Sequence, residues 1–153
     1  MENIDELLAR DAIKQAKARY LRGVDTGDSQ LVKGILAEDC VLDYMQCLTD
    51  PVTGTDFLPE MNVVVRGRAS WTSEGLRSMG IVSVHQTYNH DITLTSVNTA
   101  SCVCAMTDRL FMPAGRPYSV LTGYGYYHET YEQVDGCWWL KTLRISRLRV
   151  LAE

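Results

Sequence analysis

The chain has 153 residues, of which 46% are hydrophobic and 22% are charged, and its formal net charge is −4. These values are ordinary for a globular protein, and the length suits a single domain that spans residues 1–153 and buries its own core. The negative charge argues against nucleic acids and anionic membranes as partners, because both select surfaces rich in lysine and arginine.

The cysteine count and the start of the chain both indicate the cellular compartment of the protein. Five cysteines, with an acidic N-terminus that lacks the basic and apolar regions of a secretory signal, indicate reduced thiols in a cytoplasmic protein. No apolar run approaches the roughly 18 residues that span a bilayer. Cys102 and Cys104 resemble half of a metal site, but no second Cys/His pair follows at ligand spacing. We therefore interpret them as buried core residues and expect no metal.

The first half of the chain is expected to begin with helices. Apolar residues recur at helical spacing over residues 5–24, and Gly27 favours the end of that helix. Asp28 or Ser29 can cap a second, short helix that extends through Leu36.

The next segments alternate between strand, loop and helix. Residues 40–44 are predicted to form a strand, residues 48–59 a loop rich in turn residues, and residues 67–79 a third helix. Phe57 and Met61 are placed to form a lid.

The second half of the chain is rich in strand signals. We place strands near residues 81–95, 100–112, 118–134 and 137–149, with Asp135-Gly136 as a hairpin turn. Helices followed by a long antiparallel sheet indicate an α+β fold. The space between the two layers is a usual location for a ligand site.

Two ionisable residues of the predicted sheet are candidates for chemistry. Asp108 shares a strand face with apolar residues, so its carboxylate is expected to point inward, either as the structural partner of an arginine or as part of a site. His85 gains a catalytic role if a carboxylate orients its ring, because such a partner fixes the tautomer and raises the basicity of the imidazole. Asp25 and Asp108 are the two candidate partners.

Several tyrosines can likewise be interpreted either as structural residues or as part of a site. Tyr20 faces inward from the first helix, and Tyr44 ends the first strand. A buried phenol is usually a core residue with a hydrogen-bonded tip, but it can also donate a hydrogen bond to an enolate oxygen. Tyr124 and Tyr126 share a strand face, and either face of that strand can line a pocket.

Four basic residues follow one another along the last predicted strand. We interpret them as a solvated or subunit-contact face rather than a nucleic-acid stripe. They are Lys141, Arg144, Arg147 and Arg149.

Both ends of the chain resemble a known superfamily. The segments DELLARDAIKQAKARYLRGVDTGD and AEDCVLDY resemble the start of ketosteroid-isomerase-like proteins, also called SnoaL-like or nuclear-transport-factor-like, and YHETYEQVDGCWWLKTLRISRLR resembles their last hairpin. The resemblance implies one SnoaL-like domain over residues 1–153. Its fold would be a cone-shaped α+β barrel of the cystatin-like type, with a curved antiparallel sheet packed against N-terminal helices around a deep apolar pocket. Members include enzymes and non-enzymes, so this fold does not define an activity.

A finer match is to the bile-acid dehydratases of that superfamily. They carry a tyrosine, an aspartate five residues later, a tyrosine on the next strand, and then a histidine and an aspartate on the sheet. The matching residues here are Tyr20, Asp25, Tyr44, His85 and Asp108. Scytalone dehydratases and lindane dehydrochlorinases are similar around Asp25 and His85, so three kinds of elimination enzyme imply the same Asp–His pair.

The sequence also differs from two other groups of the superfamily at positions that carry their catalytic residues. The general-base aspartate of ketosteroid isomerases falls on Tyr44, and the lysine of the dehydrochlorinases falls on Tyr20. These differences disfavour a simple isomerase and chloride elimination.

The resemblance implies a dehydratase-like lyase that needs no cofactor. His85, oriented by Asp25, would remove a carbon-bound proton from a hydrophobic, carbonyl-bearing alcohol of steroid, polyketide or aromatic origin. Tyr20 and Tyr44 would hold the developing oxyanion or the departing hydroxyl, and Asp108 would position His85 or protonate the leaving group. The alternatives are a non-catalytic small subunit of a ring-hydroxylating dioxygenase or other ligand-binding module, and a polyketide-cyclase-like or isomerase enzyme.

Large apolar residues lead to two further expectations. Exposed residues on the outer sheet face, such as Trp138 or Trp139, predict a homo-oligomer, with a trimer favoured by the resemblance and a dimer next. Six residues are expected to shape the pocket for a small hydrophobic substrate: Phe57, Met61, Trp71, Met79, Phe111 and Tyr127.

Overall fold

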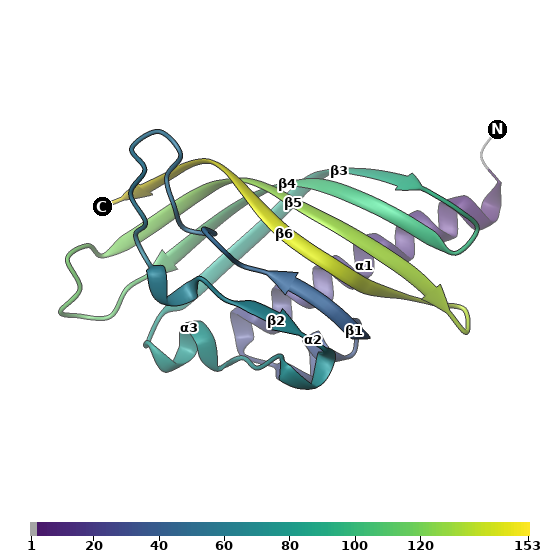
Figure 1. Ribbon diagram of the computed structural model, residues 1–153, viewed down its shortest axis with the longest axis horizontal. Helices are drawn as coiled ribbons and strands as arrows, with labels where there is room; N and C mark the ends of the chain where they lie inside the picture. Colours follow the sequence, from purple (N-terminus) through teal and green to yellow (C-terminus); the bar gives the residue numbers. More distant parts are fainter. Residues whose placement is uncertain (1–2) are drawn as a thin grey trace.

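The computed structural model describes residues 3–153, which form a long curved sheet with one long helix along it (Figure 1). The fold is α+β, as the order of the predicted elements indicates. The elements in chain order are α1 (Ile4–Thr26), α2 (Ser29–Lys33), β1 (Leu36–Asp43), η1 (Pro59–Met61), β2 (Val64–Arg66), η2 (Arg68–Ser70), α3 (Glu74–Ser78), β3 (Val82–Leu94), β4 (Thr99–Phe111), β5 (Val120–Val134) and β6 (Cys137–Ala152).

Helix α1 confirms the predicted helix and has sequence signals at both ends. The Asn3 side chain accepts a hydrogen bond from the Asp5 amide, and Gly27 ends the helix with a left-handed φ of 71°. The buried face of α1 includes Ile13, Ala16 and Tyr20. The helix therefore directs Tyr20 toward the sheet.

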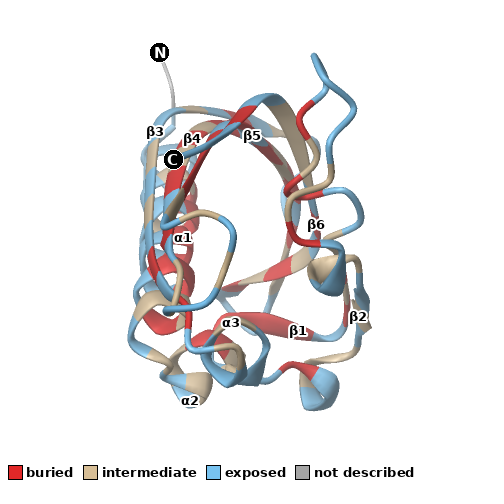
Figure 2. Cartoon of the chain, turned by 90° about the vertical axis from the view of Figure 1, so that its left-hand side faces the viewer, coloured by how far each residue is buried: buried red, intermediate tan, exposed pale blue. Residues whose placement is uncertain are grey.

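The six strands form one sheet in the order β2-β1-β6-β5-β4-β3. Neighbouring strands are antiparallel except β1 and β6, which are parallel. The sheet bends into an arch, as the curved sheet of the predicted α+β fold does, and leaves β2 and β3 as its two edges (Figure 2). Register shifts, such as the one between Tyr124 and Gly125, bend the strands further.

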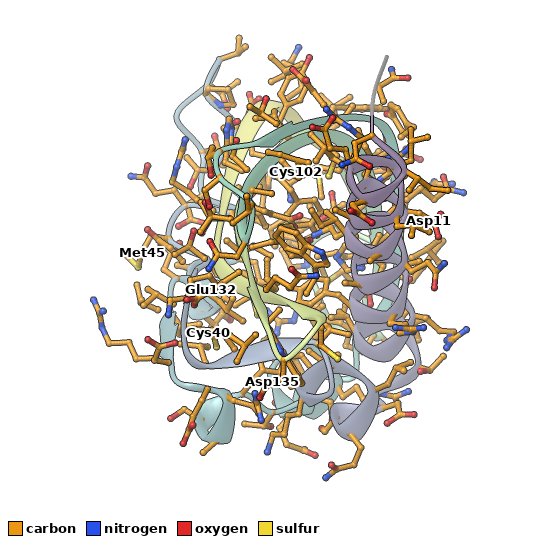
Figure 3. All side chains as sticks on the ribbon, turned by 90° about the vertical axis from the view of Figure 1, so that its right-hand side faces the viewer. Asp11, Cys40, Met45, Cys102, Glu132 and Asp135 are labelled. Carbon is orange, nitrogen blue, oxygen red and sulfur yellow. The ribbon has the colours of Figure 1, made fainter. Side chains whose placement is uncertain are left out.

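The predicted hairpin between the last two strands is confirmed. Asp135 and Gly136 have φ values of 51° and 77°, the pair of positive angles that a tight two-residue turn requires. Asp135 lies at the tip of this hairpin in Figure 3. The hairpin aligns β5 with β6, and this register determines which of their residues face inward.

Two predictions for the segment before β3 are wrong. The helix predicted over residues 67–79 is replaced by η2, an extended residue and the short helix α3. Gly67 has a φ of 82° and Trp71 a ψ of 136°, and both angles interrupt a helical hydrogen-bond ladder. The second helix ends at Lys33, before the predicted Leu36, because Leu36 already pairs with β6 at the start of β1.

The core lies on the inner side of the arch, where Figure 2 shows the buried residues. On β4 the inward face holds Asp108 together with four apolar residues, each at most 4% exposed, as strand alternation predicts: Cys102, Cys104, Met106 and Leu110. All five cysteines are free thiols, and Cys137 is the exposed one.

The outer face of the sheet differs from the prediction. Trp138 is buried in the core because it shares the inward face of β6 with Leu140, while Trp139 is partly covered by Arg68, which stacks on its ring. Exposed aromatic rings on β3 and β5, the two strands that flank β4, occupy the outer face instead: Tyr88, Tyr124 and Tyr126.

None of the helices within residues 3–153 combines the length and the apolar character needed to cross a lipid bilayer.

Candidate active site

His85 and Asp25 form the hydrogen-bonded pair that the sequence predicts. Asp25 lies in the last turn of α1 and His85 on β3, and Nδ1 of the imidazole is 2.6 Å from Oδ1 of the carboxylate. The other carboxylate oxygen accepts a hydrogen bond from the His85 backbone amide at 2.9 Å, and the Ser83 hydroxyl donates to Oδ1 at 2.9 Å. Asp25 is therefore held by three donors of β3, which fix the orientation of the imidazole.

His85 lines a cavity, whereas Asp25 is not part of the cavity lining. The cavity has a volume of about 230 Å³, and its lining includes His85, Asp108, Tyr20 and Tyr44. The carboxylate of Asp25 thus supports His85 from behind the lining. Four of the five predicted catalytic residues line one cavity, and the fifth is bonded to a residue that does.

Asp108 lies across from His85 in the pairing of β3 with β4. Its Oδ2 atom is 3.8 Å from Nε2 of His85, which is too long for a hydrogen bond but close enough for charge attraction to an imidazolium. This contact places a carboxylate on each side of the ring, so both aspartates that the sequence offered as partners are beside His85.

Arg147 is a member of this site that the sequence reasoning missed. Its side chain is 3% exposed, and its two terminal nitrogens donate to the two oxygens of Asp108 at 2.9 Å each. Burial opposes the charge of the guanidinium, but the Asp108 carboxylate outweighs burial and raises the pKa of Arg147. The interpretation of Arg147 as part of a solvated basic face is wrong.

Arg147 points into the core because of the register of β6 and because of a glycine on β5. The shift between Thr130 and Tyr131 skips Lys141, so the inward face of β6 passes from Leu140 to Leu143 and then alternates regularly to Arg147. A side chain at Gly123 would lie 2.2 Å from Asp108 Oδ1 and 2.3 Å from Arg147 Nη1. Glycines inside the predicted strand were the available signal, since they mark a close approach by another group.

Tyr20 and Tyr44 form a pair of hydrogen-bonded phenols at the cavity. Their hydroxyl oxygens are 2.6 Å apart. Burial raises the pKa of Tyr44 to about 12, although hydrogen bonds with Tyr20 and Trp71 work in the opposite direction. Burial, with the neighbouring phenol, also raises the pKa of Tyr20 well above its usual value. Both groups therefore remain neutral hydrogen-bond donors at physiological pH.

Three of the six predicted pocket residues line the cavity: Met61, Trp71 and Tyr127. Phe57, Met79 and Phe111 lie outside its lining. Phe57 and Met79 pack against a separate apolar cluster, where Phe57 meets the ring of Tyr118 edge to face. Phe111 faces outward with 38% exposure, since it alternates with the inward-facing Leu110. The lining that replaces them includes Leu76, from the segment predicted as a helix, and Val63, from a segment for which no element was predicted.

A cluster of sulfur and oxygen atoms lies deeper in the core. The ligand atoms of Cys102, Cys104 and Glu129 lie within 4.8 Å of one another. Lys17 already forms an ion pair with Glu129, so a positive charge is present there. This contact favours the interpretation of the two cysteines as core residues.

Known proteins share this architecture. The SnoaL-like domain family matches residues 5–144. Hexachlorocyclohexane dehydrochlorinase LinA-type3 from Novosphingobium barchaimii has a similar structure, with a TM-score of 0.76, 16% identity, and coverage of 99% of this chain and 94% of that chain. A proposed scytalone dehydratase from Novosphingobium aromaticivorans is similar with a TM-score of 0.74, 20% identity, and coverage of 97% and 90%.

A proposed aromatic ring hydroxylase from Novosphingobium aromaticivorans also matches, with a TM-score of 0.71, 18% identity, and coverage of 94% and 92%. At these identities the structural likeness establishes the fold, while the domain match covers most of the sequence. The chain belongs to the SnoaL-like domain family.

Proposed function

We propose that the protein is a dehydratase-like lyase that removes water, without a cofactor, from a small, uncharged, hydrophobic alcohol that carries a carbonyl group. The observation that carries this proposal is the Asp25–His85 pair at a cavity also lined by the Tyr20 and Tyr44 hydroxyls. A base beside neutral donors suits the formation of an enolate, because the donors stabilise the charge that the base creates.

His85 is the proposed base. Asp25 accepts the hydrogen bond from Nδ1, which selects the tautomer whose Nε2 atom is free to take a proton from the carbon beside the carbonyl. The imidazolium that results lies between two carboxylates, since Asp108 is 3.8 Å from Nε2. Its positive charge is therefore stabilised where it forms.

The tyrosine pair is the proposed partner of the substrate oxygen. In the bond between Tyr20 and Tyr44 one hydroxyl donates and the other accepts, so one phenolic proton is left for the developing oxyanion. The enolate then expels the hydroxyl on the next carbon. The imidazolium of His85 returns its proton to that hydroxyl, which leaves as water and restores the neutral base.

Asp108 has a positioning role in this scheme. Both of its oxygens accept hydrogen bonds from Arg147, an arrangement made by a carboxylate anion, which attracts the imidazolium but has no proton to give. We therefore assign the protonation of the leaving group to His85 rather than to Asp108.

The cavity also restricts the substrate. Its volume of about 230 Å³ is below the roughly 300–1,000 Å³ of pockets that hold drug-sized ligands, which favours a compound of one or two rings over a steroid nucleus. Arg147 in the lining is already paired with Asp108 and with the carbonyl oxygen of Cys47. A carboxylate or phosphate on the substrate would lack a free cation in the described lining.

The test separates proton removal from loss of water. Small cyclic ketones without a leaving group are incubated with the protein in D₂O, and exchange beside the carbonyl is followed by NMR. The matching β-hydroxy-ketones are assayed for loss of water by enone absorbance and by mass. We expect both activities in the protein and neither in His85→Ala. Exchange without dehydration would support the isomerase or cyclase alternative, and neither reaction on any ketone would favour a binding module.

A further inference from the structure

The mechanism leaves one buried ion pair unused. Lys17 on α1 is 1% exposed and forms an ion pair with Glu129 on β5, which is 3% exposed. The Tyr131 hydroxyl donates to the other oxygen of Glu129 at 2.7 Å. Apolar residues of similar volume often stabilise a core as well as a buried ion pair does, so stability alone is a weak reason for this one.

The ammonium group of Lys17 lies against two aromatic rings of the cavity wall. Its nitrogen is 3.2 Å from the centre of the Tyr127 ring and 4.5 Å from the centre of the Tyr20 ring. The two rings meet edge to face, with centres 6.4 Å apart and planes at 82°. Lys17 itself is absent from the cavity lining, so it contacts these rings from behind.

A cation has an effect here that an apolar side chain lacks. Ammonium groups are attracted to the faces of aromatic rings, whereas apolar contacts have little directional preference. One ammonium group over two nearly perpendicular rings therefore constrains both ring planes together. Glu129 keeps the ammonium in place, because that carboxylate is in turn held by Tyr131.

We propose that Lys17 is a positioning residue of the active site, which fixes the rings of Tyr20 and Tyr127 and thereby aims the Tyr20 hydroxyl at Tyr44 and the cavity. The inference rests on the proposed function for the donor role of Tyr20.

The main experiment replaces both charges together. Lys17→Met with Glu129→Gln avoids leaving one buried charge unpaired. The matched control is Lys141→Met with Asp39→Asn, which removes a Lys–Asp pair of 2.7 Å that is exposed and outside the cavity lining. Tyrosines labelled with ¹³C in the ring are observed by NMR, with assignments from Tyr→Phe variants, and crystal structures give the distance between the hydroxyls of Tyr20 and Tyr44.

In the Lys17/Glu129 variant we expect shifted signals for Tyr20 and Tyr127 and a distance between the two hydroxyls beyond 3.5 Å, which ends their hydrogen bond. The Lys141/Asp39 control should keep both signals. A folded Lys17/Glu129 variant with unchanged signals and an intact Tyr20–Tyr44 bond would overturn the proposal and leave the ion pair a purely structural role.

A second measurement needs no variant of the ion pair. Ring-flip rates in the unaltered protein should be slower for Tyr20 and Tyr127 than for Tyr131, which is as buried but contacts the ion pair through its hydroxyl. Equal or faster flips of Tyr20 and Tyr127 would contradict the proposal. Neither measurement uses a substrate, so their outcome is independent of the ketone assays that test the proposed function.

Discussion

Asp25 binds His85 twice, through the imidazole Nδ1 at 2.6 Å and through the backbone amide at 2.9 Å. The second bond joins the carboxylate to the strand itself, so the end of α1 is fixed relative to β3 at the residue that the mechanism needs. Ser83 adds a third donor from the same strand. The pair is thus held by the backbone as well as by its side chains, which reduces the motion available to the imidazole.

The first prediction concerns this pair. His85→Ala should lower dehydration by at least about 100-fold with the fold intact, because general-base catalysis contributes on that scale. Asp25→Asn should also impair turnover, since it removes the charge that stabilises the imidazolium. The double variant should lose little more than the worse single variant, because the two residues act as a unit.

His90→Ala is the matched control for His85→Ala, since His90 lies on the same strand but outside the cavity lining. It should retain activity. Near-normal turnover by a folded His85→Ala protein would remove His85 as the base. Steady-state rates and circular dichroism on the same samples decide between these outcomes.

The second prediction concerns the phenols. Tyr20→Phe and Tyr44→Phe should each reduce turnover less than His85→Ala, because either hydroxyl can still reach the substrate oxygen. The double variant should lose more than the product of the two single losses, since no phenol then remains in that pair. Additive losses would argue that the two hydroxyls act separately.

The pH profile provides a related prediction. The neutral phenol is the donor, and burial raises the pKa of Tyr44 to about 12. Donation by Tyr44 should therefore persist above pH 10, where an ordinary tyrosine ionises, and fail only as the pH approaches 12. A loss of turnover near pH 10 that disappears in Tyr44→Phe would contradict this assignment.

The third prediction concerns stability. Arg147→Met leaves the buried carboxylate of Asp108 without its partner, and should lower the free energy of unfolding by about 3–5 kcal/mol. Arg147→Met with Asp108→Leu should recover most of that loss, because an apolar pair needs no compensation in a core. Urea denaturation measures both values.

Arg116→Met is the comparison for that prediction. Arg116 pairs with Glu60 at 3.3 Å at the surface, and exposed pairs of this kind contribute at most about 1 kcal/mol. An equally small effect of Arg147→Met would mean that water reaches Asp108 and replaces the guanidinium.

The fourth prediction concerns assembly. We propose a homo-oligomer, with a trimer favoured, that covers the exposed aromatic rings on the outer sheet face. Tyr124→Lys with Tyr126→Lys should dissociate it, whereas Val97→Lys, in the turn between β3 and β4, should not. Light scattering that shows a monomer of the unaltered protein at micromolar concentration would contradict the proposal.

Local patterns in the sequence were sufficient for much of this protein. The helical spacing that leads to Tyr20 and the alternation that turns Asp108 inward both depend on neighbours within a few residues, and both are observed. The Asp135-Gly136 turn likewise needs only its own two residues. The family pattern then indicated that Asp25 would meet His85, which the geometry bears out.

The tertiary structure alone decided features that depend on register and on contacts distant in sequence. A shift of one residue between β5 and β6 turns Arg147 into the core, and the missing side chain of Gly123 leaves room for its bond with Asp108. The single helix predicted over residues 67–79 does not form, because the backbone angles of Gly67 and Trp71 interrupt it. As a result, residues other than the predicted ones line part of the cavity. Strand registers and buried ion pairs are chosen by the energy of the whole packed core, and for that reason no short segment encodes them.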